Sequence, residues 1–335
     1  MIYRDPVFDG ATDPVVVQDR GSGEWHMFYT QRRACVPGPG VAWVHGTDIG
    51  IAVSRDGGLT WLYRGTVQGL DFEPGRNTFW APEVCWALGR YHMLVSYIRG
   101  VPDRWAGHER QIRHYVSLDL RRWLDLGPVE LGSRHVIDAA VYPLPSGSYR
   151  LWFKDEEHGS HTYACDSADL LKWTRPQPAI TGNAHEGPNV FALGGWYWLL
   201  TDEWRGLAVY RSADLTSWEL TGMILDVPGS RPADTDVGRH ADVVESDGRA
   251  FIFYFTHPGL AGAPDKDGYE ARRSCVLAAE LRVEDDRLVC DRNAQPSAPF
   301  LAAGTPAPPA VPVRKGTHGN SGSVRPRPGV RRGAR

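Results

Sequence analysis

Residues 13–30 read DPVVVQDRGSGEWHMFYT, which is a short apolar stretch, a glycine-containing turn and an aromatic-rich stretch. In the second stretch the large apolar residues Trp25, Met27 and Tyr29 occupy every second position, as expected when one face of a sheet is buried. The pattern predicts a β-hairpin. It decides the fold because similar hairpins recur four more times along the chain.

The recurring unit has a constant order of parts. An apolar strand is followed by a turn glycine and an aromatic strand, and in the first four copies by a third strand, a Ser-x-Asp turn and a tryptophan. Such a four-stranded antiparallel sheet cannot bury both of its faces alone, and units of this size that stack radially form a β-propeller. We therefore predict an all-β fold over residues 1–301, a five-bladed β-propeller of four-stranded antiparallel blades. The hairpin glycines are Gly23, Gly89, Gly147, Gly195 and Gly248.

Composition excludes several classes of protein. A formal net charge of -3 over 335 residues does not favour binding to nucleic acid or to an anionic membrane surface. No stretch reaches transmembrane length, and residues 1–10 lack the basic and apolar regions of a signal peptide. A cytoplasmic location is therefore expected, with secretion by another route left open. Residues 302–335 are basic and rich in Pro and Gly, which predicts a disordered tail.

Acidic and imidazole side chains recur at one position of the repeat. In a propeller the innermost strand of each blade lines the central channel, and its first residues lie at one mouth of that channel. We predict that these side chains converge there, whereas Asp5, in the earlier of two Asp-Pro pairs, has no counterpart and is a turn residue. The predicted ring comprises Asp13, Glu83, Asp138, Glu186 and the pair His240 and Asp242.

A ring of carboxyl groups favours one kind of chemistry. Like charges and burial raise the pKa of neighbouring carboxyl groups, and such clusters are frequent at functional sites. Glycoside hydrolysis needs one protonated carboxyl group to donate to the leaving oxygen and one ionised group to activate water. Aromatic residues near the same mouth would supply flat surfaces for sugar rings. The predicted substrate-binding residues are Trp43, His45, Trp80, Glu83, Trp105 and Trp204.

The motifs around these residues resemble known glycosidases. ATDPVVV, FWAPEV, VIDAAVY and HEGPNVF, in this order with one per blade, resemble the five-bladed enzymes of glycoside hydrolase family 43. HEGPNVF, GRHADVV and IFYFTHP are still more similar to the related family 117, the anhydrogalactosidases that act on neoagaro-oligosaccharides. The resemblance covers residues 3–295. It implies an inverting, exo-acting hydrolase of oligosaccharides, with arabinofuranosides or 3,6-anhydrogalactosides among the candidate substrates.

The resemblance also implies a role for each residue. Asp13 matches the general base, Asp138 the carboxylate that tunes and orients the acid, and Glu186 the general acid of family 43. His185 competes with Glu186 for the acid role, because family 117 assigns it to the histidine before the glutamate. His240 matches a histidine that faces a calcium ion or another divalent cation through water, although the chemistry itself requires no cofactor. An inverting enzyme would hold the carboxyl groups of Asp13 and Glu186 roughly 6.5–9.5 Å apart.

Three other functions compete with hydrolysis. A glycoside phosphorylase on the same fold would need phosphate-binding side chains, and Arg32, Arg33 and Arg99 keep this alternative open. A non-catalytic carbohydrate-binding propeller would tolerate loss of the base or the acid. A sialidase would need three clustered arginines and a tyrosine nucleophile, usually on six blades, and the five predicted blades argue against it. Family 117 dimerises through an N-terminal helical extension that this sequence does not contain, so a homodimer is only an alternative to a monomer.

The stretch SRDGGLTW, residues 54–61, fits the Asp-box pattern S-x-D-x-G-x-T-W. Weaker copies follow the third strand of the next three repeats. We interpret this turn as a structural brace on the outer part of each blade, and the tryptophan at its end as a core residue.

Overall fold

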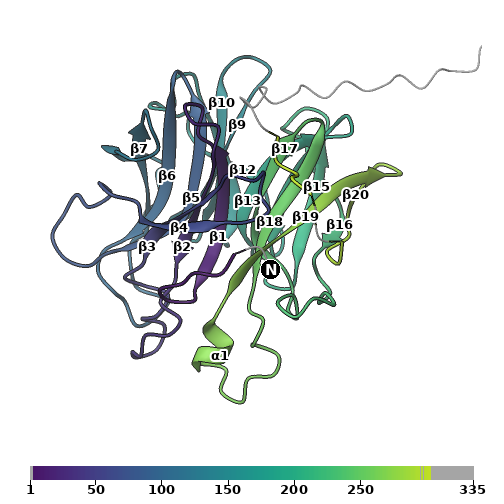
Figure 1. Ribbon diagram of the computed structural model, residues 1–335. Helices are drawn as coiled ribbons and strands as arrows, with labels where there is room; N and C mark the ends of the chain where they lie inside the picture. Colours follow the sequence, from purple (N-terminus) through teal and green to yellow (C-terminus); the bar gives the residue numbers. More distant parts are fainter. Residues whose placement is uncertain (1–2, 295, 297, 303–335) are drawn as a thin grey trace, which may run out of the picture.

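The computed structural model describes residues 3–294, 296 and 298–302, and it confirms the five-bladed propeller (Figure 1). Five four-stranded sheets follow one another along the chain. In each sheet the strands are antiparallel and lie in chain order. Nearly all of the predicted tail, residues 303–335, lies outside the described residues.

Each blade consists of four consecutive strands. Blade 1 contains β1 (Ala11–Gln18), β2 (Trp25–Gln31), β3 (Asp48–Ser54) and β4 (Leu62–Thr66). Blade 2 contains β5 (Thr78–Ala87), β6 (Arg90–Ile98), β7 (Gln111–Ser117) and β8 (Leu124–Pro128). Blade 3 contains β9 (Val136–Pro143), β10 (Tyr149–Asp155), β11 (His161–Ser167) and β12 (Gln177–Ile180). Blade 4 contains β13 (Glu186–Leu193), β14 (Trp196–Asp202), β15 (Leu207–Ser212) and β16 (Glu219–Ile224). Blade 5 contains β17 (Arg239–Ser246), β18 (Arg249–Thr256), β19 (Cys275–Glu284) and β20 (Arg287–Cys290), with the short helix α1 (Tyr269–Arg272) between β18 and β19.

The first strands of the blades surround the central channel. Each of β1, β5, β9, β13 and β17 contacts the first strands of both neighbouring blades, so the five strands form a closed ring. The blades are held together by apolar contacts rather than by shared strands. Each of the five junctions between blades contains its own cluster of buried apolar side chains, which removes from water the faces that a single sheet would expose.

The Asp-box prediction is confirmed. The Asp56 carboxylate accepts hydrogen bonds from the Ser54 hydroxyl (2.9 Å) and from the Thr60 hydroxyl (2.6 Å) and backbone N–H (2.9 Å). The Trp61 indole donates to the Gly58 carbonyl (3.0 Å), and Trp61 is buried in the cluster between blades 5 and 1. Equivalent Ser-x-Asp turns brace blades 2, 3 and 4. This motif is therefore structural.

The N-terminal segment seals the junction between blades 5 and 1. Tyr3 exchanges two backbone hydrogen bonds with Val276 of β19 (3.0 and 2.9 Å). The Asp5 carboxylate accepts from the backbone N–H groups of Val7 and Phe8 (3.0 and 2.6 Å) and from the Tyr29 hydroxyl (2.6 Å). Asp5 is thus a structural turn residue, as the repeat predicts.

The last described residues cover the same junction. The N–H groups of Phe300 and Leu301 donate to the Gly57 carbonyl (2.9 and 3.0 Å), and the Trp25 indole donates to the carbonyl of Ala302 (3.2 Å). These contacts attach Ala302, the first residue of the predicted tail, to blade 1.

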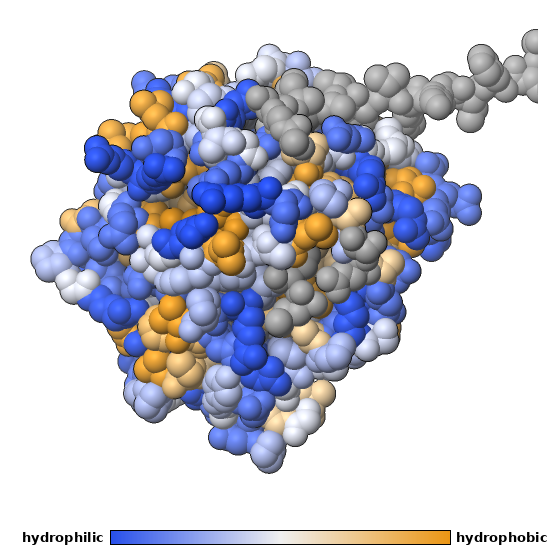
Figure 2. All heavy atoms as spheres, viewed as in Figure 1, coloured by the Kyte–Doolittle hydropathy of each residue, from blue (hydrophilic) through white to orange (hydrophobic). Residues whose placement is uncertain are grey.

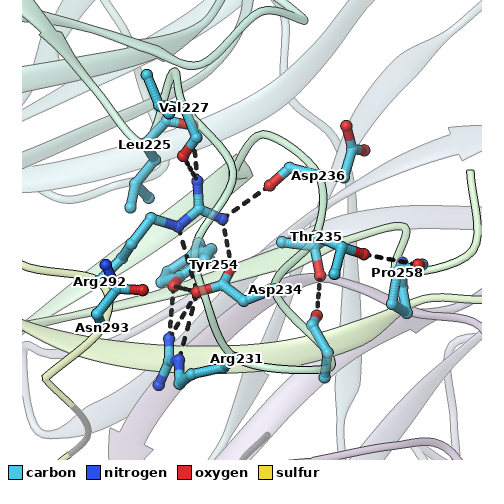
Figure 3. Close-up of polar contacts among 12 residues, drawn as sticks. Leu225, Val227, Arg231, Asp234, Thr235, Asp236, Tyr254, Pro258, Arg292 and Asn293 are labelled. Atoms are coloured by element: carbon cyan, nitrogen blue, oxygen red, sulfur yellow. Dashed lines mark hydrogen bonds and ion pairs between the residues drawn. The ribbon is translucent and has the colours of Figure 1, made fainter. Parts of the chain in front are cut away.

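A buried ionic network fixes the loop between β16 and β17 (Figure 3). The fully buried Asp234 carboxylate accepts from Arg231 (2.9 Å), from the Tyr254 hydroxyl (3.0 Å) and from Arg292, which follows β20. Arg292 also donates to the backbone carbonyl of Asp236 (2.8 Å). The network therefore sets the position at which the chain enters β17, the innermost strand of blade 5.

The face of the molecule shown in Figure 2 is mostly hydrophilic, and its hydrophobic side chains form small, separate patches. Within the described part of the chain, no helix is long and apolar enough to cross a membrane.

We predict that Asp234→Ala lowers the free energy of unfolding by about 3–5 kcal/mol, because it leaves two buried guanidinium groups without their carboxylate. Urea denaturation measures the loss. Asp226→Ala, an exposed aspartate in the same loop, is the matched control and should change stability by less than about 0.5 kcal/mol. Equal effects of the two substitutions would contradict this role of the network.

Candidate active site

A β-bulge near the start of every innermost strand brings side chains to the channel mouth. The pairing of each first strand with its second strand shifts at this point in all five blades. In four blades the bulge includes a residue with positive φ: Asp13 (49°), Ala81 (42°), Asp138 (59°) and Gly187 (58°). This conformation is costly for residues other than glycine, although aspartate tolerates it better than most, and such strain is concentrated at functional sites. In blade 5 the bulge falls at His240.

A cavity of about 690 Å³ lies at this mouth, a volume typical of a small-molecule site. All five blades contribute side chains to it. It brings together the predicted catalytic residues Asp13, Asp138 and Glu186, the predicted cation residue His240, and the four predicted tryptophans Trp43, Trp80, Trp105 and Trp204.

The structure corrects the position of Glu83. Because the bulge in blade 2 falls at Ala81, Glu83 occupies the next inward-facing position and lines a second cavity of about 660 Å³ towards the other end of the channel. Asp242 and Glu245 line the same second cavity. Burial, together with the charge of Asp242, raises the pKa of Glu83 to about 8. Glu83 is therefore separated from the predicted substrate site.

Asp13 lies between two cationic side chains. Its carboxylate is 3.5 Å from the Arg32 guanidinium and 3.7 Å from Nδ1 of His240, and it accepts a hydrogen bond from the Thr12 hydroxyl (3.0 Å). Burial by itself would lower the pKa of His240, but the surrounding carboxylates, led by Asp138 and Asp13, raise it above its ordinary value. A protonated His240 thus offsets part of the negative charge of the site.

The buried Asp138 and Asp202 form a carboxyl cluster with Glu186, whose side chain is 24% exposed. Burial raises the pKa of Asp138 to about 6, with His240 opposing and Glu186 adding to the effect. Burial and the charge of Glu186 raise the pKa of Asp202 to about 7. Asp138 also accepts from the backbone N–H of Gly187 (3.1 Å), which ties it to the residue that follows Glu186.

Lys154 decides the protonation of Glu186. Burial would raise the pKa of Glu186, but the Lys154 ammonium at 3.2 Å and then His240 outweigh it, and the pKa is lowered. Lys154 lies 3.4 Å from Glu156 and 5.2 Å from the centre of the Trp204 ring, and the Trp204 indole also donates to Glu186. In the free site Glu186 is therefore ionised, and the more basic carboxyl groups are Asp138 and Asp202.

His185 lies outside the cavity in a closed hydrogen-bonding environment. It is 1% exposed, its Nδ1–H donates to the Asn183 carbonyl (2.8 Å), and Nε2 accepts from the Thr162 hydroxyl (2.7 Å). Burial lowers its pKa. A neutral imidazole whose two nitrogens are both engaged has no proton to give to a ligand in the cavity, so the structure does not support His185 as the acid.

His45 supports the aromatic wall instead of lining it. It is fully buried, and its ring lies 4.8 Å from Trp80 and 6.0 Å from Trp105. Its Nδ1–H donates to the Val41 carbonyl (3.1 Å), and burial lowers its pKa to about 4. The predicted contact between His45 and substrate is therefore corrected to a packing role beneath the tryptophans.

The residues around His240 do not fit a directly ligated metal ion. Among residues 3–294, 296 and 298–302, no three His, Cys, Asp or Glu side chains are arranged to hold one. The raised pKa of His240 also favours an imidazolium, which has no free lone pair for a metal. No step proposed below uses a metal.

Sequence reasoning missed Lys154 and Asp202. Both lie at the end of a second strand, which the antiparallel hairpin places beside the start of the first: Asp202 pairs with Glu186, and Lys154 pairs with Ile137, the neighbour of Asp138. The hairpin register was the signal that could have found them. Of the arginines considered for phosphate binding, Arg32 alone lines the cavity.

Comparison with known proteins reveals a shared fold. No family model and no curated protein sequence matches the chain. Among solved structures, a thermostable family-43 glycoside hydrolase has a TM-score of 0.65 at 19% identity. The matched region covers 90% of this chain and 100% of that protein. An α-L-arabinofuranosidase from Lactobacillus brevis has a TM-score of 0.63 at 16% identity, covering 90% of this chain and 98% of its own. A xylan β-1,4-xylosidase from Bacillus halodurans C-125 has a TM-score of 0.62 at 16% identity, covering 94% of this chain and 61% of its own.

These structural matches confirm the predicted resemblance to family-43 propellers at the level of the fold. The identities are too low to carry an activity, and the resemblance to family 117 stays a prediction.

We predict that Asp138→Asn becomes increasingly stable relative to the wild type as pH rises from 4.5 to 7.5. The folded-state pKa of Asp138, about 6, lies above its ordinary value of 3.8. Between these values the folded protein binds more protons than the unfolded chain, so wild-type stability falls as pH rises, and a neutral asparagine escapes this penalty. Urea denaturation at the two pH values measures the difference, and a difference independent of pH would contradict the raised pKa.

Proposed function

We propose that the protein is an inverting, exo-acting glycoside hydrolase. The observation that carries the proposal is the convergence of Asp13, Asp138 and Glu186 on one tryptophan-lined cavity of a five-bladed propeller. The aromatic side chains would stack against sugar rings, and the carboxyl groups would supply the acid and the base. The names of the structurally similar proteins are consistent with this reading.

Asp13 acts as the general base. Its carboxylate accepts the proton of a water molecule that attacks the anomeric carbon, on the face of the sugar opposite the leaving oxygen. Arg32 and His240 hold the carboxylate by charge, and the bulge holds its backbone. Because water attacks directly, the configuration at the anomeric carbon inverts.

Glu186 acts as the general acid, and it must be protonated when the substrate is bound. Lys154 has a second carboxylate within reach, Glu156, and a sugar bound against Trp204 would displace the ammonium towards it. Without Lys154 beside it, the burial of Glu186 raises its pKa. Asp138, the neighbour with a raised pKa, is positioned to keep a proton available.

The tryptophans divide into fixed and exposed platforms. Trp80 is only 8% exposed, and its indole N–H donates to the Val44 carbonyl (2.6 Å), so it forms a rigid wall. Trp105 and Trp204 are 54% and 43% exposed at the rim. A pocket with one rigid wall and an exposed rim suits a terminal sugar whose leaving group extends towards solvent.

We predict that Asp13→Asn and Glu186→Gln each lower kcat by at least about 100-fold, since each removes one partner of general acid–base catalysis. The measurement is hydrolysis of aryl furanosides, aryl pyranosides and neoagaro-oligosaccharides, with proton NMR of the first anomer released. Glu83→Gln is the matched control, because Glu83 lies in the other cavity and should leave kcat unchanged. Release of the retained anomer would disprove inversion, and sugar binding without any turnover would favour a non-catalytic binding protein.

We also predict that Lys154→Met moves the alkaline limb of the kcat/KM profile to higher pH. Removal of the ammonium leaves burial to raise the pKa of Glu186, so the acid keeps its proton further into the alkaline range. Glu156→Gln retains the ammonium and is the control, for which the limb should not move upward. An unchanged limb in Lys154→Met would show that the acid is not Glu186.

A further inference from the structure

Positive charge is concentrated on one side of the cavity. Blades 1 and 5 and the loop between β18 and β19, which carries α1 (Figure 1), supply four cationic side chains to its wall. The carboxyl cluster comes from blades 3 and 4, where Lys154 also lines the cavity. The four cationic residues are Arg32, Arg239, Lys266 and Arg272.

Three of these cations surround the end of β18. The Arg32 guanidinium lies 5.3 Å from the centre of the Phe255 ring, and Arg239 is the cross-strand partner of Phe255. Arg272 precedes Arg273, whose carbonyl accepts a hydrogen bond from Nδ1–H of His257 (3.1 Å). The residues Arg32, Arg239 and Arg272 thus lie near one short segment and all line the cavity, and we call them the arginine cluster.

Carboxylates of the protein satisfy this cluster only in part. Arg32 is 3.5 Å from Asp13, and Arg239 is 3.2 Å from Asp236. Arg272 lies 5.3 Å from the centre of the Trp43 ring, and no carboxylate of the described residues forms an ion pair with it. A cation stacked on an aromatic ring at the wall of a cavity is a recognised way to hold a guanidinium ready for an anion.

Unused hydrogen-bond donors accompany this excess of charge. The Nε atoms of Arg32, Arg239 and Arg272 are all buried, and none has a hydrogen-bond partner in the part of the chain that the structure describes. A buried donor without a partner is costly, and more so when the group is charged. Three such donors belong to the arginine cluster, and a fourth, the Nε of Arg110, belongs to another side chain that lines the cavity.

His257, which feels the charges of Arg32 and Arg239, does not itself carry a positive charge. Burial, and then the charges of Arg32 and Arg239, lower the pKa of His257 to about 3, so the ring is neutral. The charges of Arg32 and Arg239 thus already act on His257 in the free protein. An anion placed there would gain from the same charges.

We propose that the arginine cluster binds an oxyanion beside the catalytic carboxylates. This inference rests on the proposed hydrolase function and names its substrate class: a glycoside whose terminal sugar bears a carboxylate or a sulfate, such as a uronic acid. Free phosphate has the same recognition chemistry and is the alternative source of the oxyanion. Because Arg32 contacts Asp13, the anion lies next to the attacking group and belongs to the sugar that is cleaved.

The chemistry of the groups matches the proposal. A carboxylate or sulfate accepts several hydrogen bonds, and guanidinium groups donate them in pairs with fixed geometry. A neutral sugar would offer the guanidinium groups of the cluster no charged acceptor. No tyrosine of the described residues lines the cavity, which removes the nucleophile that a sialidase would need and keeps water activation by Asp13 as the chemistry.

A binding experiment tests the oxyanion site independently of any turnover. Isothermal calorimetry would compare glucuronate with glucose, and galacturonate with galactose, on the wild type, Arg272→Gln and Arg239→Gln. We expect at least one uronate to bind at least about 10-fold more tightly than its neutral counterpart, and each substitution to abolish that difference. Arg273→Gln is the matched control, because Arg273 pairs with Glu270 and does not line the cavity. Uronate binding that depends on Arg272, without hydrolysis of any glycoside, would support the oxyanion site while the proposed function failed.

Kinetics then identifies the source of the oxyanion. Paired aryl uronides and aryl glycosides, with and without inorganic phosphate, would be assayed with the same variants. A preference for the uronide that falls roughly 10- to 100-fold in Arg272→Gln would assign the anion to the substrate. Turnover that requires phosphate and releases a sugar 1-phosphate would assign it to phosphate. Equal binding and turnover of acidic and neutral sugars, unaffected by phosphate, Arg272→Gln and Arg239→Gln, would overturn the proposal while leaving the hydrolase function intact.

Discussion

The bulge at the start of each innermost strand is the constraint on which the site depends. A regular strand would send alternate side chains into the packed faces of its own blade. The bulge inserts a residue, bends the strand and presents a side chain at the channel mouth. Asp13 and Asp138 also have positive φ, so positioning these two carboxylates introduces backbone strain. Five repeats of one local device thus produce one concave site.

Charge balance follows from that geometry. Carboxyl groups brought together in a buried mouth cannot all ionise without partners. The structure meets this requirement unevenly. Lys154 keeps Glu186 ionised, His240 and Arg32 accompany Asp13, and Asp138 has a raised pKa of about 6. Acid and base roles thus depend on which carboxyl group has a nearby cation. Under the proposed function, displacement of Lys154 from Glu186 would couple binding of the sugar to protonation of the acid.

The sequence predicted the features that local patterns determine. It failed for features that depend on the register between paired strands. The repeat predicted the five blades because hairpin glycines and strand alternation are local signals, and it separated Asp13 from Asp5. Glu83 was misplaced because the bulge in blade 2 falls at Ala81, which no spacing to a glycine reveals. Asp202 was missed because its place depends on the pairing across the hairpin with Glu186.

The arginine cluster depends on structure that no repeat encodes. Arg272 lies on a short helix in an irregular loop, and the entry to β17 that precedes Arg239 is set by the buried Asp234 network. The carboxylates that would perform the chemistry come from the regular parts of the blades, whereas the cations that would select the substrate come largely from loops and their junctions. A propeller divided in this way can keep one reaction mechanism while its loops change the sugar that it accepts. The charge of those loops, more than the ring of acids, would therefore determine which substrate this protein binds.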